Sequence, residues 1–155
     1  VGLICLQIFG YKDDSAREHA IDLGLAMQLT NIARDIQEDL GLGRIYLPQD
    51  EIARFGYSEE ALEAGIVNES FIDLMRFQAQ RARGYFDSGF KLLPYLLPRS
   101  RACPAVMGQL YSKVLQRIEE AEFDVFQHRI SLSKTEKLRV TAQTWFTSML
   151  PSSLR

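Results

Sequence analysis

Residues 28–39 constrain this chain most strongly, because amide and carboxylate side chains recur there at the spacing of one helix face. Gln28, Asn31, Asp35 and Asp39 follow one another at intervals of three or four residues. At about 100° per residue, the last three fall within an arc of roughly 80°. Apolar residues border this arc, and we expect them to be buried: Leu25, Leu29, Ile32, Ile36 and Leu40. The pattern predicts a helix with an acidic edge beside a buried face.

The acidic edge has the ligand chemistry of a divalent-metal site. Carboxylates beside an apolar face are costly unless a cation neutralises them, and two carboxylates four residues apart repel each other. Mg²⁺ prefers oxygen ligands, and one or two protein carboxylates suffice because water and phosphate fill its other positions. We therefore predict that Asn31, Asp35 and Asp39 bind Mg²⁺ or, alternatively, Mn²⁺. A calcium loop is excluded, since the sixth residue counted from Asp35 is Leu40 and the twelfth is Tyr46.

The metal interpretation competes with simpler ones. Other carboxylates four residues apart, such as Glu59 and Glu63, are interpreted as solvated helix faces, and the same explanation remains open for the acidic edge. Arg34 has two possible partners, because it lies one turn from Glu38 and also beside the predicted metal site.

Composition limits the class of protein. At 155 residues with 46% hydrophobic and 25% charged residues, we expect a single domain over residues 1–155. The net charge of −2 without a dense basic cluster argues against nucleic-acid binding. Cys5 and Cys103 are far apart, which predicts reduced thiols, no zinc and a cytoplasmic protein. Residues 1–9 are too few to span a bilayer. Because the chain starts in this apolar run and without Met, we expect a fragment of a longer protein.

Nearly every segment has helical periodicity. Ser15 with Glu18, and Ser133 with Glu136, have the spacing of a capping box. Trp145 is expected to anchor the last helix by packing. Strand-like alternation is absent, so we predict an all-α helical bundle. Its expected helices comprise residues 15–40, 49–55, 58–65, a longer helix that starts at 68 or 70 and ends near 93, 104–129 and a last helix from 133.

Residues 23–39, followed by the Gly-Arg-Ile-Tyr-Leu-Pro run at 43–48, resemble the second aspartate-rich motif of the squalene and phytoene synthase family. Similarity continues through Tyr85 and through residues 111–129. The resemblance implies an isoprenoid-synthase bundle around a deep cavity, and head-to-head condensation of two prenyl diphosphates to a linear C30 or C40 hydrocarbon. It also implies that this is the carboxyl-terminal portion of such an enzyme, incomplete at its amino-terminal side, because the family's first aspartate-rich motif would precede Val1.

The resemblance assigns roles to individual residues. Asp35 and Asp39 would be catalytic and hold the metal with help from Asn31. Rings at Tyr46 and Tyr111 would stabilise developing carbocations, although such aromatic residues more often belong to the core. Five residues would bind the substrate diphosphate: Gln28, Asn31, Arg34, Arg44 and Arg129. With only one of the two acidic motifs, this chain alone is predicted to have little or no synthase activity.

Product and partners follow from the same resemblance. We favour phytoene formation from two geranylgeranyl diphosphates. Squalene or presqualene diphosphate formation from farnesyl diphosphate is the alternative, and NADPH would be needed only for squalene. A non-catalytic assembly factor of the same fold, or a helical module that binds a basic partner, is a further alternative. A water-insoluble product also suggests peripheral contact with a membrane. The sequence leaves C15 against C20 substrates and the oligomeric state undecided.

Overall fold

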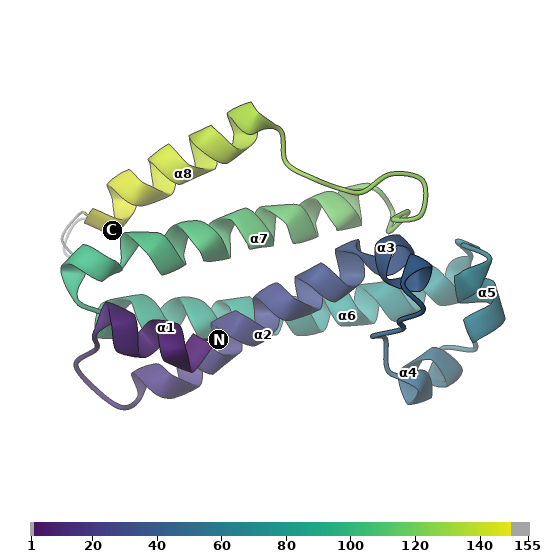
Figure 1. Cartoon of the computed structure of the whole chain (residues 1–155), viewed down its shortest axis with the longest axis horizontal. Coiled ribbons are helices and arrows are strands. Elements are labelled where there is room, and N and C mark those ends of the chain that lie inside the picture. The colour runs from purple at the N-terminus through teal and green to yellow at the C-terminus, as the bar shows by residue number, and fades with distance from the viewer. Residues whose placement is uncertain (1, 150–155) are drawn as a thin grey trace.

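The computed structural model describes residues 2–149 and confirms the predicted all-α bundle (Figure 1). Within these residues no strand forms, although one isolated bridge pairs Tyr11 with Leu96. The helices are α1 (Gly2–Phe9), α2 (Ala16–Arg34), α3 (Ile36–Gly41), α4 (Gln49–Arg54), α5 (Glu59–Glu63), α6 (Glu69–Gly89), the 3₁₀ helices η1 (Phe90–Tyr95) and η2 (Pro98–Ser100), α7 (Ala102–Glu120) and α8 (Lys134–Met149).

Helices α2 and α6 pack side by side along the bundle, and α7 lies against both (Figure 1). Helix α1 covers the first half of α2, and α8 packs on α7 at the outer edge. The core lies where α2, α6 and α7 meet, because these helices carry apolar residues at helical spacing. Its buried side chains include Leu23, Ala26, Phe71, Leu74, Met75, Phe86, Leu115 and Ile118.

Glycine allows α6 to approach α2 closely at its carboxyl end. A Cβ on Gly89 would lie 2.7 Å from both the backbone N and the Cα of Leu23. Real Cβ atoms do not come so near backbone atoms, so no larger residue fits without displacing a helix. This contact fixes α2, and with it the acidic edge, against the core.

The predicted helix over residues 15–40 is interrupted at Asp35. This residue has φ −99° and ψ 15°, so α2 ends at Arg34 and α3 begins at Ile36. The backbone hydrogen bonds continue across the break, with Asp35 N donating to Asn31 O at 2.8 Å and Asp39 N to Asp35 O at 2.9 Å. Neither Pro nor Gly occurs at residues 33–37, so the residue types there do not predict the break.

Two other helices end earlier than predicted. Helix α6 stops at Gly89 rather than near residue 93, and its chain continues as the 3₁₀ helix η1. Helix α7 stops at Glu120 rather than near residue 129, because Glu122 and Phe123 adopt φ values of 51° and 63° that no right-handed helix contains. Consequently Arg129 lies in an irregular segment between α7 and α8.

One predicted capping box forms and the other does not. Glu136 N donates to Ser133 Oγ at 3.2 Å, and Ser133 N donates to Glu136 Oε2 at 2.9 Å, which confirms the box at α8. Ser15 accepts no capping hydrogen bond. Instead Ser15 N donates to Asp13 Oδ1 at 2.7 Å, so Asp13 organises the turn that precedes α2.

The buried face of α2 differs from the predicted one. Leu25 is 41% exposed, whereas the buried side chains are those of Ala16, Ala20, Leu23, Ala26, Thr30 and Ala33. Small residues face the core because α6 packs closely there. Of the predicted strip, Ile36 is buried and Leu29, Ile32 and Leu40 are partly buried. Trp145 is 48% exposed, so its predicted role as a packing anchor is also wrong.

Candidate functional site

A polar hollow of about 340 Å³ lies where α2 and α3 meet α7. Seven of the nine residues that the sequence singled out line it, together with Ile32: Gln28, Asn31, Arg34, Asp35, Asp39, Tyr46 and Tyr111. Arg129 reaches the hollow through an ion pair with Asp35. Arg44 lines an adjoining crevice that Asp39 and Tyr46 share. The predicted residues therefore form one constellation although they come from distant segments.

Asp35 is held by two arginines. Arg34 donates to both carboxylate oxygens, from Nε to Oδ1 at 2.7 Å and from Nη2 to Oδ2 at 2.6 Å. Its Nη2 also donates to Asn31 Oδ1 at 2.9 Å, and Arg129 Nε donates to Asp35 Oδ1 at 3.1 Å. Partial burial by itself would raise the pKa of Asp35, but the hydrogen bonds and charges of Arg34 and Arg129 lower it below the usual value.

Arg34 therefore bonds with its neighbour in sequence rather than with Glu38. The carboxylate of Glu38 forms its ion pair with Arg129, whose Nε is 3.2 Å from Oε1. The open alternative of an Arg34 pair with Glu38 is thus wrong. Arg129 bridges the carboxylates of Asp35 and Glu38 and so ties the segment after α7 to α3.

Asp39 has no such counter-ion. Its partly buried carboxylate makes no ion pair and accepts no hydrogen bond among residues 2–149. The acidic edge therefore offers one carboxylate that arginines neutralise and one that is available to a ligand. A carboxylate in this position is a ready acceptor for a hydrated cation.

The segment after α3 is built to return Arg44 and Tyr46 to the acidic edge. Gly43 has φ +67°, a left-handed conformation that suits glycine, and Arg44 N donates back to Asp39 O at 2.9 Å. Helix α4 is then fixed to α6 by Glu51, which accepts hydrogen bonds from Gln78 and Arg81. The turn and this anchor hold the segment across the hollow.

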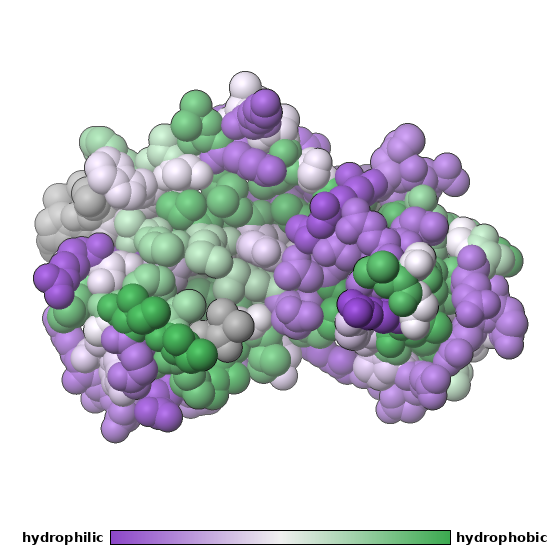
Figure 2. Space-filling view, viewed as in Figure 1, coloured by the Kyte–Doolittle hydropathy of each residue, from purple (hydrophilic) through white to green (hydrophobic). Residues whose placement is uncertain are grey.

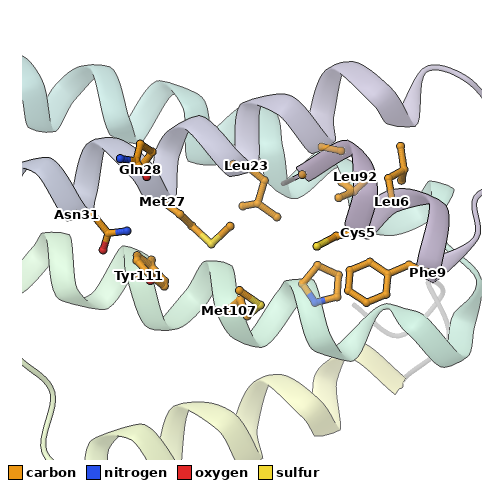
Figure 3. A pocket seen from close by; sticks show the side chains of 14 residues that line it. Cys5, Leu6, Phe9, Leu23, Met27, Gln28, Asn31, Leu92, Met107 and Tyr111 are labelled. Carbon is orange, nitrogen blue, oxygen red and sulfur yellow. The ribbon is translucent and has the colours of Figure 1, made fainter.

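An apolar cavity of about 240 Å³ continues from the polar hollow between α1, α2 and α7 (Figure 3). Gln28, Asn31 and Tyr111 line both spaces. In Figure 3 these three residues lie at one end, and Met27 and Met107 lie between them and Phe9 at the far end. A ligand with a charged head and an apolar chain would fit this arrangement, because the two environments meet without a barrier of buried charge.

The hollow supplies some, but not all, of the ligands that a magnesium ion needs. Asn31, Asp35 and Asp39 supply oxygen atoms only, which is the ligand chemistry of Mg²⁺ rather than of zinc. Nevertheless no group of three or more His, Cys, Asp or Glu side chains that could hold a metal exists within residues 2–149. The remaining positions around an ion would have to be filled by water, phosphate or groups from elsewhere.

Sequence reasoning missed two parts of the site. The first is the apolar wall that α1 contributes through Cys5 and Phe9, because the apolar run at residues 1–9 is interpreted from the sequence as too short for a membrane span and as the start of a fragment, and not as a cavity wall. Its helical spacing was the available signal. The second is the Glu51 anchor, for which no local signal existed, since its partner Arg81 lies 30 residues away.

Comparison with known proteins identifies relatives of this chain. The sequence profile described as squalene/phytoene synthase matches residues 1–136. The phytoene synthase of Mycobacterium tuberculosis is 39% identical over 145 residues, which cover 92% of this chain and 48% of that protein. The phytoene synthase of Arthrospira platensis is 43% identical over 151 residues, which cover 89% and 49%. The chain thus spans about half the length of these curated relatives.

Solved structures agree with the fold. A dehydrosqualene synthase crystallised with a ligand superimposes with a TM-score of 0.75 and 27% identity, over 83% of this chain and 46% of that one. YisP from Bacillus subtilis superimposes with a TM-score of 0.81 and 30% identity, over 91% of this chain and 57% of that one. With the matching profile over residues 1–136, the chain belongs to the squalene/phytoene synthase family.

Proposed function

We propose that this chain supplies one metal-binding edge and part of the prenyl pocket of a synthase that joins two prenyl diphosphates head to head. The observation that carries the proposal is the shared lining of the polar hollow and the apolar cavity by Gln28, Asn31 and Tyr111. A diphosphate in the hollow would place its prenyl chain along the cavity. The reaction would then occur at the boundary between them.

The polar hollow would promote departure of the diphosphate. Asp39 and Asp35, with Asn31, would hold Mg²⁺, which when bound supplies positive charge that neutralises the departing diphosphate. Arg44 has no ion pair among the described residues, so its guanidinium is available for phosphate oxygens. Arg34 and Arg129 would contact the diphosphate only after exchanging part of their bonding to Asp35. The charge on the leaving group would thus be shared between metal and guanidinium groups.

The apolar cavity would protect the carbocation that remains. Side chains such as Leu6, Leu23 and Phe9 carry no nucleophilic atom and would help to exclude water. Tyr111 lies at the mouth of the cavity, where its ring would face the allylic carbon, and Tyr46 lies across the hollow. These rings would stabilise positive charge without reacting with it.

The relatives favour a phytoene-forming enzyme that uses two geranylgeranyl diphosphates, because the curated relatives compared above bear the name phytoene synthase. A squalene-type reaction on farnesyl diphosphate is the second candidate, since the similar solved structures include a dehydrosqualene synthase and a squalene synthase. NADPH would be required only if the product is squalene. A non-catalytic assembly role is disfavoured by the unpaired carboxylate of Asp39.

Every helix in the described part of the chain is too short or too polar to span a bilayer. The product of either reaction is a hydrocarbon that does not dissolve in water. The proposal therefore includes peripheral contact of the enzyme with a membrane, which would take up this product.

Isothermal titration calorimetry with inorganic pyrophosphate tests directly whether the acidic edge binds a metal ion. With Mg²⁺ present, the chain is expected to bind pyrophosphate, and chelation with EDTA should abolish the binding. Asp39→Asn should weaken the Mg²⁺-dependent binding at least tenfold, because it removes a charged ligand of the ion.

The matched control is Asp73→Asn. Asp73 lies on the surface of α6 and pairs with Arg76, so its loss should leave pyrophosphate binding unchanged. Equal Mg²⁺-dependent pyrophosphate binding by the wild type and the Asp39→Asn variant would refute the proposal that the acidic edge binds the metal ion.

A further inference from the structure

The segment between α7 and α8, residues 121–133, carries Arg129 to the acidic edge, and we call it the strap. In Figure 1 it leaves α7 beside α3 and then turns back to the start of α8. No backbone-to-backbone hydrogen bond joins residues 125–132 to another described residue. Three apolar side chains of the strap are buried instead: Phe123, Val125 and Leu132. Side chains therefore hold the strap in place, with Arg129 on its exposed stretch.

The two limbs of the strap are held unequally. On the limb that leaves α7, the ring of Phe126 lies 5.2 Å from that of Phe71, and Asp124 Oδ1 accepts a hydrogen bond from Phe126 N at 3.3 Å. On the limb that returns to α8, residues 130–131 line a hollow of about 340 Å³ together with the end of α7. The returning limb is thus not packed tightly against α7 there. Its position depends on how its end at α8 is held.

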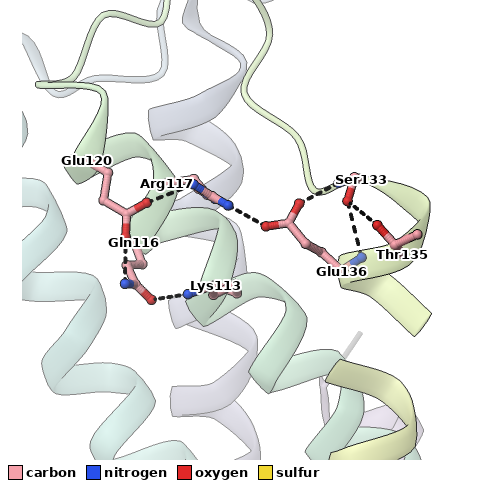
Figure 4. A network of polar contacts seen from close by, with 7 residues as sticks. All are labelled: Lys113, Gln116, Arg117, Glu120, Ser133, Thr135 and Glu136. Carbon is pink, nitrogen blue, oxygen red and sulfur yellow. Dashed lines mark hydrogen bonds and ion pairs between the residues drawn. The ribbon is translucent and has the colours of Figure 1, made fainter. Parts of the chain in front are cut away.

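That end is tied to α7 through Glu136 (Figure 4). Glu136 forms an ion pair with Arg117 of α7, and its Oε2 accepts a hydrogen bond from Ser133 N at 2.9 Å. Arg117 is oriented in turn by Glu120, at 3.1 Å. The hydrogen bonds from Arg117 and Ser133 lower the pKa of Glu136 to about 2, so the ion pair stays charged at neutral pH. We call the Arg117 and Glu136 ion pair the latch.

The latch is close enough along the chain to control Arg129. Arg129 lies four residues before Ser133, a length of chain that spans at most about 14 Å when extended. Its Nε is 3.1 Å from Asp35 Oδ1 and 3.2 Å from Glu38 Oε1. The side chain is 52% exposed and loses rotamer freedom in these contacts, so they persist only where the backbone is held at the right distance.

We propose that Glu136 is a positioning residue for Arg129, because its ion pair with Arg117 holds the returning limb of the strap against α7. The latch thereby keeps the Arg129 guanidinium at the acidic edge. The inference deepens the proposed function and rests on it for the consequence for ligands. When a diphosphate binds, Arg129 would exchange Asp35 for phosphate oxygens while the strap stays in place, so little further ordering of the chain is needed.

Two variants of the 155-residue chain open the latch from opposite sides. Glu136→Gln and Arg117→Gln each remove the ion pair, and the capping box survives both because Gln also serves in it. NMR then measures how fast the Arg129 Nε proton exchanges with water. We expect exchange at least threefold faster in either variant. The double variant should be no faster than the single ones, because the same interaction is lost only once.

Arg83→Gln is the matched control. Arg83 pairs with Glu119 between α6 and α7, and these side chains are 45% and 28% exposed, against 45% and 30% for the two residues of the latch. The control therefore removes a surface ion pair of α7 that has the same exposure and no link to the strap. The exchange of the Arg129 proton should remain as in the wild type. Circular dichroism checks that every variant remains helical.

Calorimetric titration with pyrophosphate and Mg²⁺ measures the consequence for ligand binding. Both latch variants should bind pyrophosphate at least threefold more weakly, and Arg83→Gln should bind it like the wild type. A wild type that binds no pyrophosphate would overturn the proposed function. The exchange of the Arg129 proton needs neither metal nor pyrophosphate, so it decides separately whether Glu136 positions Arg129.

Three results would overturn the positioning role. One is unchanged exchange of the Arg129 proton in both latch variants. Another is exchange that Arg83→Gln accelerates as much, which would reduce the latch to general stabilisation of the surface. The third is faster exchange together with unchanged pyrophosphate affinity, which would show that the position of Arg129 does not matter to the ligand.

Discussion

At the scale of residues, Asp35 and Asp39 are four positions apart and yet differ in what neutralises them. Asp35 is bonded by Arg34 and Arg129, whereas Asp39 has no ion pair among residues 2–149. A cation can therefore bind Asp39 without displacing a protein group. Binding at Asp35 requires an exchange of partners. Arg129 is the more exchangeable of the two arginines, because it is 52% exposed against 16% for Arg34.

Arg129→Gln is expected to raise the pKa of Asp35 toward its usual value. The substitution removes one of the two cations that lower this pKa, while Arg34 remains. A carboxyl group whose pKa is lowered by folding stabilises the protein above its unfolded pKa and loses that contribution as the pH falls through the folded pKa. Any stability advantage of the wild type over the variant should therefore disappear in acid.

Carbon NMR of the Asp35 carboxyl group measures this titration. Arg76→Gln is the matched control, because Arg76 pairs with Asp73 on the surface of α6. If Arg129→Gln left the titration of Asp35 unchanged, the ion pair between them would not exist in solution.

The candidate site was largely predictable at this scale, since the three-and-four spacing of residues 28–39 placed four polar side chains on one edge. The hydrogen-bond partner of Arg34, in contrast, could not be predicted from the sequence. Spacing made Glu38 equally suitable, and the outcome depended on the path of the chain after α7. The positive φ values at Glu122 and Phe123 set that path. Non-glycine residues seldom adopt such values, so sequence alone did not foretell them.

At the scale of elements, close contact between α2 and α6 positions the acidic edge, and Gly89 permits it. Gly89→Ala should destabilise the protein by about 1–3 kcal/mol, because its Cβ would meet backbone atoms of Leu23 that cannot move aside. Gly84 lies on the same helix, and a Cβ added there would have no atom within 4 Å. Gly84→Ala should therefore stabilise the protein by roughly 0.5–1 kcal/mol.

Urea unfolding followed by circular dichroism compares the two variants with the wild type. Equal effects of the two substitutions would show that the α2 and α6 contact is looser than described.

The helical periodicity of the apolar residues predicts that the helices exist, but it does not predict where they end. The capping box at Ser133 formed because Glu136 also finds Arg117 on α7. The same spacing at Ser15 was overridden by Asp13 in the preceding turn. Local signals of this kind state what a segment can form, and tertiary contacts decide which of them is used.

At the scale of the whole molecule, the apolar cavity and the face of α1 are left uncovered. Ile4 and Ile8 of α1 are strongly exposed, and Figure 2 shows the hydrophobic colour concentrated over this helix. The chain also spans about half the length of the relatives it matches. In the chain by itself, water would reach a carbocation through the uncovered side of the cavity, and a second diphosphate would lack acidic ligands.

We therefore predict that the 155-residue chain alone forms no detectable phytoene or squalene from geranylgeranyl or farnesyl diphosphate with Mg²⁺. Extraction into organic solvent and chromatography measure the product. The full-length phytoene synthase of Arthrospira platensis, assayed in parallel, is the positive control. Turnover by the chain itself would contradict the view that one acidic edge is insufficient.

The central claim is that the acidic edge binds a divalent ion together with a diphosphate. Anomalous diffraction from crystals soaked with Mn²⁺ and pyrophosphate tests it most directly, because the scattering locates the ion. We predict a peak about 2.0–2.2 Å from an Asp39 carboxylate oxygen, with pyrophosphate beside Arg44 and Arg129 withdrawn from Asp35. A peak elsewhere, or none in crystals that retain pyrophosphate, would contradict the account.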